Sequence, residues 1–273
     1  MRSLKENIET ELSKQEGIFA VAFKDLSTSK TLLINDTVTF HAASTMKTPV
    51  LIEVYEQAAE RKFSLSDSLL IKNEFKSIVD GSSFSLDSVD DSETELYRHI
   101  GEKRTISFLV YQMIIVSSNL ATNLVIDLVD AKNVSATMRE LGAGDIHVLR
   151  GVEDNKAFAL GLNNTITANG LMLLFEKMAK GKAVDAASSQ AMIDILLDQK
   201  FNEIIPAGLP ANVKVAHKTG SITGVHHDSG IIFLPGGRKY VLVLLSKKLK
   251  DEKAAVKTMA NVSRLIYEYV TAR

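Results

Sequence analysis

Apolar residues recur with the period of an α-helix at the start of the chain and then with that of strands. The helical period predicts an amphipathic helix over 4–15, which ends before Gly17. Two apolar runs, 18–26 and 30–35, lie on either side of a turn made of Ser and Thr. This part of the chain is therefore expected to form a terminal helix and a strand pair.

Helical period takes over at Ser44 and dominates the middle of the chain. A second apolar stripe begins at Ile106 and ends at the string Ser-Ser-Asn, 117–119, after which helical character resumes. Two more helices are predicted at about 167–180 and 184–199. Residues 76–95 are rich in Ser and Asp and are expected to form an exposed loop region, and residues 150–165 have no period and are expected to form a long loop.

Strand character returns after Val213. Residues 213–220 end in a glycine and include β-branched residues, and two later apolar runs are joined by Pro235-Gly236-Gly237, a hairpin signal. A final amphipathic helix is predicted over 251–271.

Strands at both ends and helices between them predict an α+β sandwich fold. One antiparallel sheet would be formed from both termini and flanked by the terminal helices, with an all-helical region inserted. We expect residues 1–43 and 212–273 to form the sheet unit and 44–211 the helical unit, with the active site between them.

Composition and charge narrow the function classes. The 273 residues are 45% hydrophobic and 24% charged, and the net charge of −1 provides no basic field for nucleic acid or anionic membrane. There is no cysteine, and no apolar run approaches the length of a membrane span. The first residues contain no apolar core of a signal peptide, so we expect either a cytoplasmic protein or a mature domain without its leader.

The string Ser44-Thr45-Met46-Lys47 places a hydroxyl and an amine three residues apart, a spacing that suits one face of a helix. Positions i and i+3 share a helix face, so Lys47 can reach Ser44 and remove its proton if burial lowers the lysine pKa. The alternative is an N-capping serine beside a solvated lysine, which is the usual meaning of such a short string.

Two further strings follow in a fixed order, Ser117-Ser118-Asn119 and Lys218-Thr219-Gly220. With these three motifs the chain resembles the penicillin-recognising serine hydrolases, and within them most resembles class A β-lactamases. The order of helices and strands is similar to the family layout over essentially the full chain. One departure is Ser118, where the family motif usually carries Asp.

The resemblance implies a role for each motif residue. The acylated nucleophile would be Ser44, its proton acceptor Lys47, and the hydroxyl that passes a proton to the leaving nitrogen Ser117. Backbone N–H groups of the nucleophile and of Ser221 would form the oxyanion hole. The residues implied in substrate binding are Asn119, Lys218, Thr219, Gly220 and Ser221.

The loop at 150–165 departs further from the family. Class A enzymes carry Glu-x-x-x-Asn there, and the Glu activates the water that frees the enzyme. Glu153 is the candidate for this catalytic base, but Ala157 stands at the Asn position, and Asp154 or Asn155 are alternatives in register. By resemblance, Asn123 would brace this loop, and we expect Arg150 and Asn164 to hold its ends.

A metal site is not expected, although His226, His227 and Asp228 stand together. Adjacent residues of a strand point to opposite faces, and zinc needs three or four convergent ligands. One of the two histidines is expected to line the site. His217 precedes Lys218 and should point the other way, into packing. No cofactor is implied.

Three functions stay open. The first is a serine β-lactamase that confers antibiotic resistance through an acyl-enzyme on Ser44. The second is a D-alanyl-D-alanine peptidase or esterase that deacylates β-lactams slowly, and the third is a lactam-binding module without catalysis. In each case the partner is a small β-lactam or peptidoglycan-like molecule, with no nucleic acid and no membrane span. The resemblance implies a periplasmic or secreted monomer.

Overall fold

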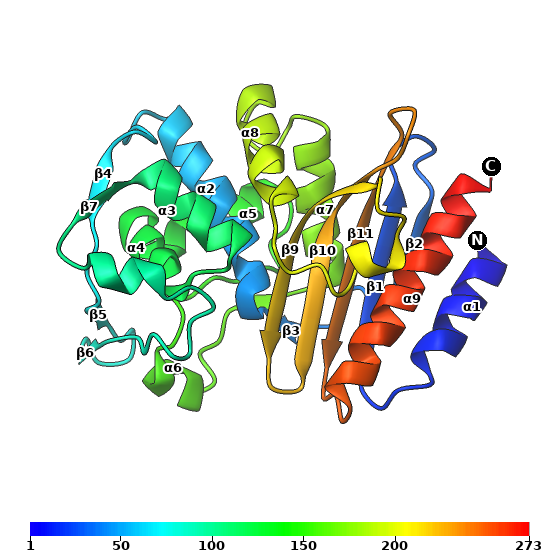
Figure 1. Cartoon of the computed structure of the whole chain (residues 1–273), viewed down its shortest axis with the longest axis horizontal. Coiled ribbons are helices and arrows are strands. Elements are labelled where there is room, and N and C mark those ends of the chain that lie inside the picture. Colours follow the sequence, from blue (N-terminus) through cyan, green and yellow to red (C-terminus); the bar gives the residue numbers. More distant parts are fainter. Residues whose placement is uncertain (273) are drawn as a thin grey trace.

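A five-stranded antiparallel sheet made from both ends of the chain lies beside a group of helices (Figure 1). The computed structural model describes residues 1–272. In spatial order the strands are β2 (Thr31–Ile34), β1 (Ile18–Asp25), β11 (Lys239–Lys247), β10 (Val225–Phe233) and β9 (Lys214–Ile222). The predicted sheet from both termini, including the hairpin between β10 and β11, is confirmed.

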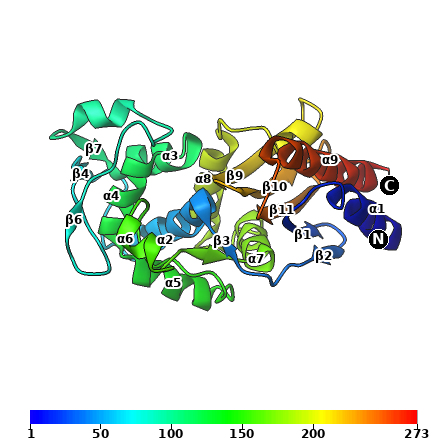
Figure 2. The same cartoon turned by 90° about the horizontal axis from the view of Figure 1, so that it is seen from below.

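Both faces of this sheet are buried, which explains the unbroken apolar run in β11. Its alternate residues Tyr240, Leu242 and Leu244 belong to one hydrophobic core, and the residues between them belong to the other. Helices α1 (Arg2–Leu12) and α9 (Glu252–Thr271) cover the first face. Figure 2 shows α7 (Ala168–Ala179) on the opposite side of the sheet from α9.

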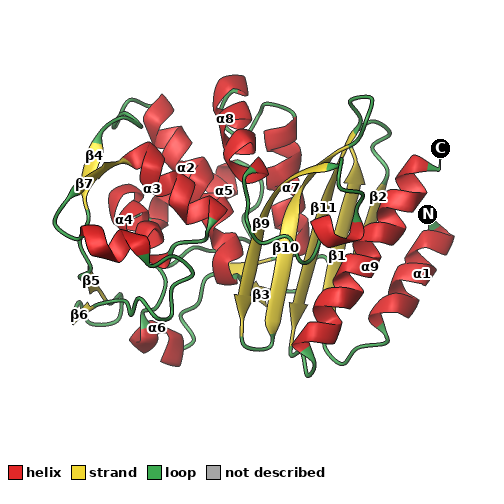
Figure 3. Ribbon diagram, viewed as in Figure 1, coloured by secondary structure: helices red, strands yellow, loops and turns green. Residues whose placement is uncertain are grey.

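The inserted region is mainly helical, as Figure 3 shows. Its other helices are α2 (Lys47–Ala59), α3 (Ile106–Ile115), α4 (Asn119–Val129), α5 (Ala131–Glu140), α6 (Asn155–Ala159) and α8 (Ala186–Leu197), with short 3₁₀ turns η1 (Ala43–Met46), η2 (Glu95–His99) and η3 (Pro206–Gly208). It is not all-helical, because it contains short strand pairs. These are β4 (Ser68–Leu70) with β7 (Lys103–Thr105), β5 (Phe75–Lys76) with β6 (Ser83–Phe84), and β8 (Thr165–Ile166), which pairs with β3 (Phe40–His41). Strands this short carry too few residues to display a period.

The boundary between the two regions is closely packed. Helix α7 belongs to the segment predicted to be the helical unit, yet it packs against β1, β10 and β11 of the sheet. The division into 1–43 plus 212–273 and 44–211 therefore stays a prediction. Within residues 1–272, no helix has the length and apolar character needed to cross a membrane.

Candidate active site

Ser44 lies between two cavities at the junction of the helices and the sheet. One cavity of about 500 Å³ opens toward Thr219, Ser221 and His226, and another of about 350 Å³ opens toward Glu153. Ser44 was predicted to begin an α-helix, but it lies in the 3₁₀ turn η1, and α2 begins only at Lys47. The change from 3₁₀ to α-helix is confined to this turn, and Ser44 and Lys47 stay three residues apart.

Lys47 is fully buried, so the alternative of a solvated lysine is wrong. Its Nζ donates to the carbonyl oxygen of Ser117 at 2.7 Å, to Ser117 Oγ at 3.1 Å and to Asn119 Oδ1 at 2.9 Å. Burial lowers the pKa of Lys47 to about 7, against the opposing attraction of the Asp91 and Glu153 carboxylates. Near neutral pH the amine therefore exists in both protonation states.

Ser117 brings the second and third motifs together. Its backbone adopts a positive φ of 57°, and its Oγ accepts hydrogen bonds from Lys47 and, at 3.1 Å, from Lys218 Nζ. Lys218 is also fully buried. Burial and the nearby Lys47 charge hold the Lys218 pKa well below its usual value, while Asp228 acts in the opposite direction. One hydroxyl thus contacts two amines that both have lowered pKa values.

Strand β9 runs beside the start of η1. A Cβ atom at Gly220 would lie 2.9 Å from the backbone nitrogen of Ser44 and 2.9 Å from that of Thr45. These neighbours are backbone atoms, which cannot turn aside as a side chain can. Glycine at 220 therefore allows the strand to approach the Ser44 amide.

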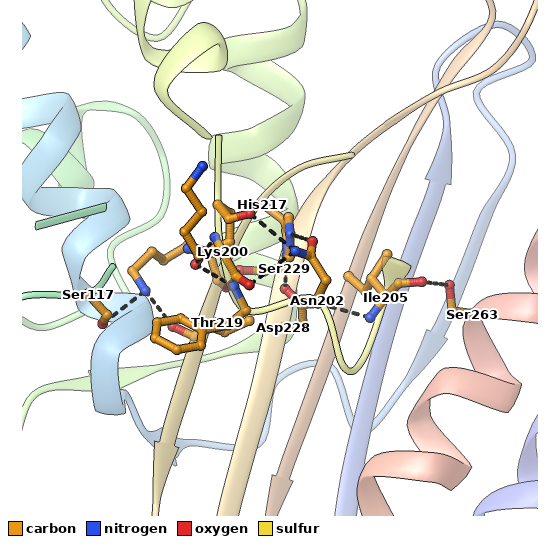
Figure 4. Close-up of polar contacts among 12 residues, drawn as sticks. Ser117, Lys200, Asn202, Ile205, His217, Thr219, Asp228, Ser229 and Ser263 are labelled. Atoms are coloured by element: carbon orange, nitrogen blue, oxygen red, sulfur yellow. Dashed lines mark hydrogen bonds and ion pairs between the residues drawn. The ribbon is translucent and has the colours of Figure 1, made fainter. Parts of the chain in front are cut away.

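A hydrogen-bond network around the buried side chains of His217 and Asp228 connects β9 and β10 to neighbouring segments (Figure 4). His217 was expected to serve in packing, but its Nδ1 pairs with Asp228 Oδ1 at 2.8 Å and its Nε2 lies 3.2 Å from Asn202 Oδ1. Asp228 Oδ2 accepts the backbone N–H of Ile205 at 2.9 Å, and Ser263 Oγ donates to the carbonyl oxygen of Ile205 at 2.9 Å. The network thereby ties α9 and the 202–205 segment to the strand that carries Lys218.

Both histidines of the pair at 226–227 line the larger cavity, as expected for one of them. His226 Nε2 pairs with Glu252 Oε2 at 2.8 Å, whereas His227 lies between backbone carbonyl oxygens of His226 and His41. Within residues 1–272, no group of three or more His, Cys, Asp or Glu side chains converges in a way that could hold a metal ion.

The loop at 150–165 is held at both ends as predicted. Asn164 accepts the backbone N–H groups of Leu149 and Arg150 and donates to the carbonyl oxygen of Arg150. Arg150 in turn donates to the carbonyl oxygen of Leu162 at 2.9 Å. The amide of Asn123 exchanges two hydrogen bonds with the backbone of Val152, at 2.7 and 3.0 Å, which is the predicted brace.

Glu153 has a positive φ of 62° and lines the 350 Å³ cavity together with Ser44. Its Oε1 accepts from Asn119 Nδ2 at 2.7 Å, so the Asn119 amide bridges Glu153 and Lys47. Burial raises the Glu153 pKa, opposed by the Asn119 hydrogen bond.

The alternatives to Glu153 in the loop are less suited to act on a substrate. Asp154 is buried, and its oxygens accept from Ser77 Oγ and from the backbone N–H groups of Ile78 and Ala157. Asn155 lines the same cavity as Glu153, but it has no carboxylate to accept a proton.

One residue near the site was missed from the sequence. Asp91 lies in the segment 76–95 that was predicted to be an exposed loop, yet it is only 7% exposed and contacts the start of α4. The surrounding composition is typical of a solvated loop and gives no reason to single out this aspartate.

Comparison with known proteins also relates this chain to β-lactamases. Residues 3–270 match the model of the Beta-lactamase enzyme family. The chain is 31% identical over 155 residues to β-lactamase AER-1 of Aeromonas hydrophila, a match that covers 52% of the chain and 51% of AER-1. The chain thus matches about half the length of this curated relative.

Solved structures match over nearly the full length. A β-lactamase from Sphaerobacter thermophilus has a TM-score of 0.85 and 25% identity, with 99% of this chain and 98% of that one covered. PBP-A has a TM-score of 0.86 and 24% identity, with 99% and 97% covered, which shows the likeness of fold. The resemblance first drawn from three short motifs is confirmed, and the chain belongs to the Beta-lactamase enzyme family.

Proposed function

We propose that this protein is a serine β-lactamase that hydrolyses its substrate through an acyl-enzyme on Ser44. The observation that carries the proposal is the buried Lys47, whose Nζ donates to Ser117 and Asn119, two residues that line the 500 Å³ cavity together with Ser44. A hydroxyl becomes a nucleophile when a neighbouring base takes its proton. A lysine with a pKa of about 7 is such a base at neutral pH.

In the acylation step, Ser44 Oγ attacks the lactam carbonyl carbon and its proton passes to Lys47. The carbonyl oxygen becomes an oxyanion, which the backbone N–H groups of Ser44 and Ser221 stabilise. The ring C–N bond then breaks, and the nitrogen takes a proton from Ser117 Oγ, which regains one from Lys47 or Lys218. The hydrogen bonds of Ser117 Oγ to both amines support this relay.

In the deacylation step, Glu153 takes a proton from a water molecule whose oxygen attacks the ester carbon. The ester C–O bond then breaks, the Ser44 oxygen takes the proton that Glu153 had accepted, and both residues return to their starting states. Two features support Glu153 in this role: its hydrogen bond to Asn119 and the cavity that it lines together with Ser44. The ionised carboxylate is the active form, and a raised pKa makes that carboxylate a stronger base at neutral pH.

A second candidate is a peptidase or esterase that is acylated by β-lactams and hydrolyses the resulting acyl-enzyme only slowly. Ala157 stands where the family motif has Asn, so the carboxylate at 153 lacks that partner. Among the structures similar in fold is a single-residue mutant of PBP-A, described as an acyl-enzyme complex with penicillin G. In this candidate Ser44 and Lys47 keep their roles and only the release step is slow.

Intact-mass measurement against time, after mixing the protein with benzylpenicillin, separates these functions. A β-lactamase is expected to turn over a chromogenic cephalosporin and to return to its free mass once the penicillin is consumed. A slow peptidase or esterase would keep the added mass for a long time. Ser44→Ala is the control and should gain no mass. A wild-type protein that neither gains mass nor turns over the cephalosporin would contradict both functions and indicate a binding module.

The pH dependence of acylation should report Lys47. Because its pKa lies at about 7, the neutral base is lost as pH falls through that value. We expect kcat/KM to fall about tenfold per pH unit below this point, as for any single essential base. Stopped-flow acylation between about pH 5 and about pH 9, in buffers of matched ionic strength, measures this limb. A rate independent of pH across this range would contradict a catalytic role for neutral Lys47.

The location and assembly follow from the proposed substrate. β-Lactams meet their targets outside the cytoplasmic membrane, so we propose a periplasmic or secreted protein that acts as a monomer and protects its host against these antibiotics.

A further inference from the structure

The Asp91 carboxylate is buried at the start of helix α4. Both of its oxygens lie 2.9 Å from the backbone nitrogen of Asn119 and accept its N–H. The carboxylate also accepts the backbone N–H of Leu120 at 3.0 Å and that of Glu93 at 3.2 Å. Tyr97 OH donates a further hydrogen bond at 2.9 Å. Asp91 is separated from Asn119 by 28 positions, so this is a tertiary contact and not a local helix cap.

The contact fixes the turn that carries two residues of the site. Asn119 bridges Lys47 and Glu153 through its side chain, and Asp91 holds the backbone nitrogen of that same residue. The neighbouring Ser92 Oγ donates to the carbonyl oxygen of Val116 at 2.7 Å. Asp91 and Ser92, which belong to a distant segment, thus bond to the backbone at both ends of residues 116–120.

We propose that Asp91 is a positioning residue, which holds the 117–119 turn in register with Lys47 and Glu153 and adds a negative charge beside them. The inference rests on the proposed function. The helix start favours a carboxylate, because its free N–H groups carry partial positive charge. At this helix end the side-chain Oγ of Ser118 accepts the N–H of Ala121 but carries no charge, so the negative charge comes from Asp91 in the distant loop.

The charge has a consequence that packing alone would not have. The groups acting on Lys47 are the carboxylates of Asp91 and Glu153, with Lys218 as the nearby cation. The groups acting on Glu153 are Asp90, Asp91 and Lys47. Asp91 raises the pKa of both Lys47 and Glu153. Removing its charge therefore lowers both pKa values, and each base stays active to lower pH.

The test compares Asp91→Asn with wild type in kcat/KM for a chromogenic cephalosporin across pH. We expect a fall of about 10- to 100-fold at the optimum, the cost of slightly misplaced reacting groups. We also expect the acid limb, the part of the pH profile where kcat/KM falls as pH decreases, to move to lower pH. The control is Asp185→Asn, which removes a carboxylate cap from the start of α8, and it should leave both measures unchanged.

A second variant separates positioning from folding. Asp91→Ser combined with Ser118→Asp returns a carboxylate to the same helix end, and it should recover most of the activity lost in Asp91→Ser alone. Unchanged kcat/KM and acid limb in Asp91→Asn would overturn the proposal. A loss of activity with a lower melting temperature, an unmoved limb and no recovery in the double variant would overturn it as well. A wild-type protein that is never acylated would instead refute the proposed function.

Discussion

Replacing Glu153 with Gln should leave acylation of Ser44 intact and trap the adduct. The amide keeps an oxygen that can accept from Asn119 Nδ2, the contact of 2.7 Å that holds the side chain in place. It cannot take a proton from water at neutral pH. Deacylation should therefore slow by about 10²- to 10⁴-fold, the usual contribution of a general base.

Intact mass against time, after a single dose of benzylpenicillin, measures the trapping. The variant should gain the mass of one penicillin as fast as wild type and then keep it. Glu176→Gln is a matched control, because Glu176 is a mostly buried carboxylate on α7 that pairs with Lys24 and Lys180. If wild type and Glu153→Gln turn over alike, Glu153 has no catalytic role and the base must be sought elsewhere in the 350 Å³ cavity.

Replacing Lys47 with Met should have its effect one step earlier, on acylation. Methionine fills similar space in the buried position but can neither accept the Ser44 proton nor donate to Ser117 and Asn119. We expect the acylation rate constant to fall by about 10²- to 10⁴-fold, as for loss of a general base. The acid limb near pH 7 should also vanish from the residual activity, because its titrating group is gone.

Labelling with a fluorescent penicillin at several pH values measures both effects. Lys24→Met is the control, since it removes a partly buried lysine of β1 that pairs with Glu176. Thermal unfolding of each variant shows whether the protein is folded at the assay temperature. Labelling of a folded Lys47→Met at the wild-type rate would exclude Lys47 as the base.

The order of elements could be predicted because hydrophobic period is a local property. The apolar run of β11 and the helical stripe of α3 are each visible within about ten residues, the usual length of such elements. The boundary at Ser44 was predicted less well. The 3₁₀ turn η1 differs from an α-helix by one residue in its hydrogen bonds, and such endings are decided by packing.

The predicted site residues come together to different degrees. The Ser117 turn contacts Lys47 and Lys218, and Asn119 adds Glu153 to the same group. Asp91 was predicted to be exposed, because a Ser- and Asp-rich segment is usually solvated. Its burial results from free N–H groups at the start of α4, which become its partners only when the chain has folded.

The sequence by itself determined the fold class, the three motifs and the family, because residue order and period are read along the chain. Only the tertiary structure decided the lowered pKa of Lys47, the hydrogen bond of Glu153 to Asn119 and the place of Asp91. Each depends on burial and on partners far along the chain, 70 positions for Lys47 with Ser117 and 28 for Asp91 with Asn119. Such contacts are set by packing of the whole chain, and the energy of a charge depends on what surrounds it in space.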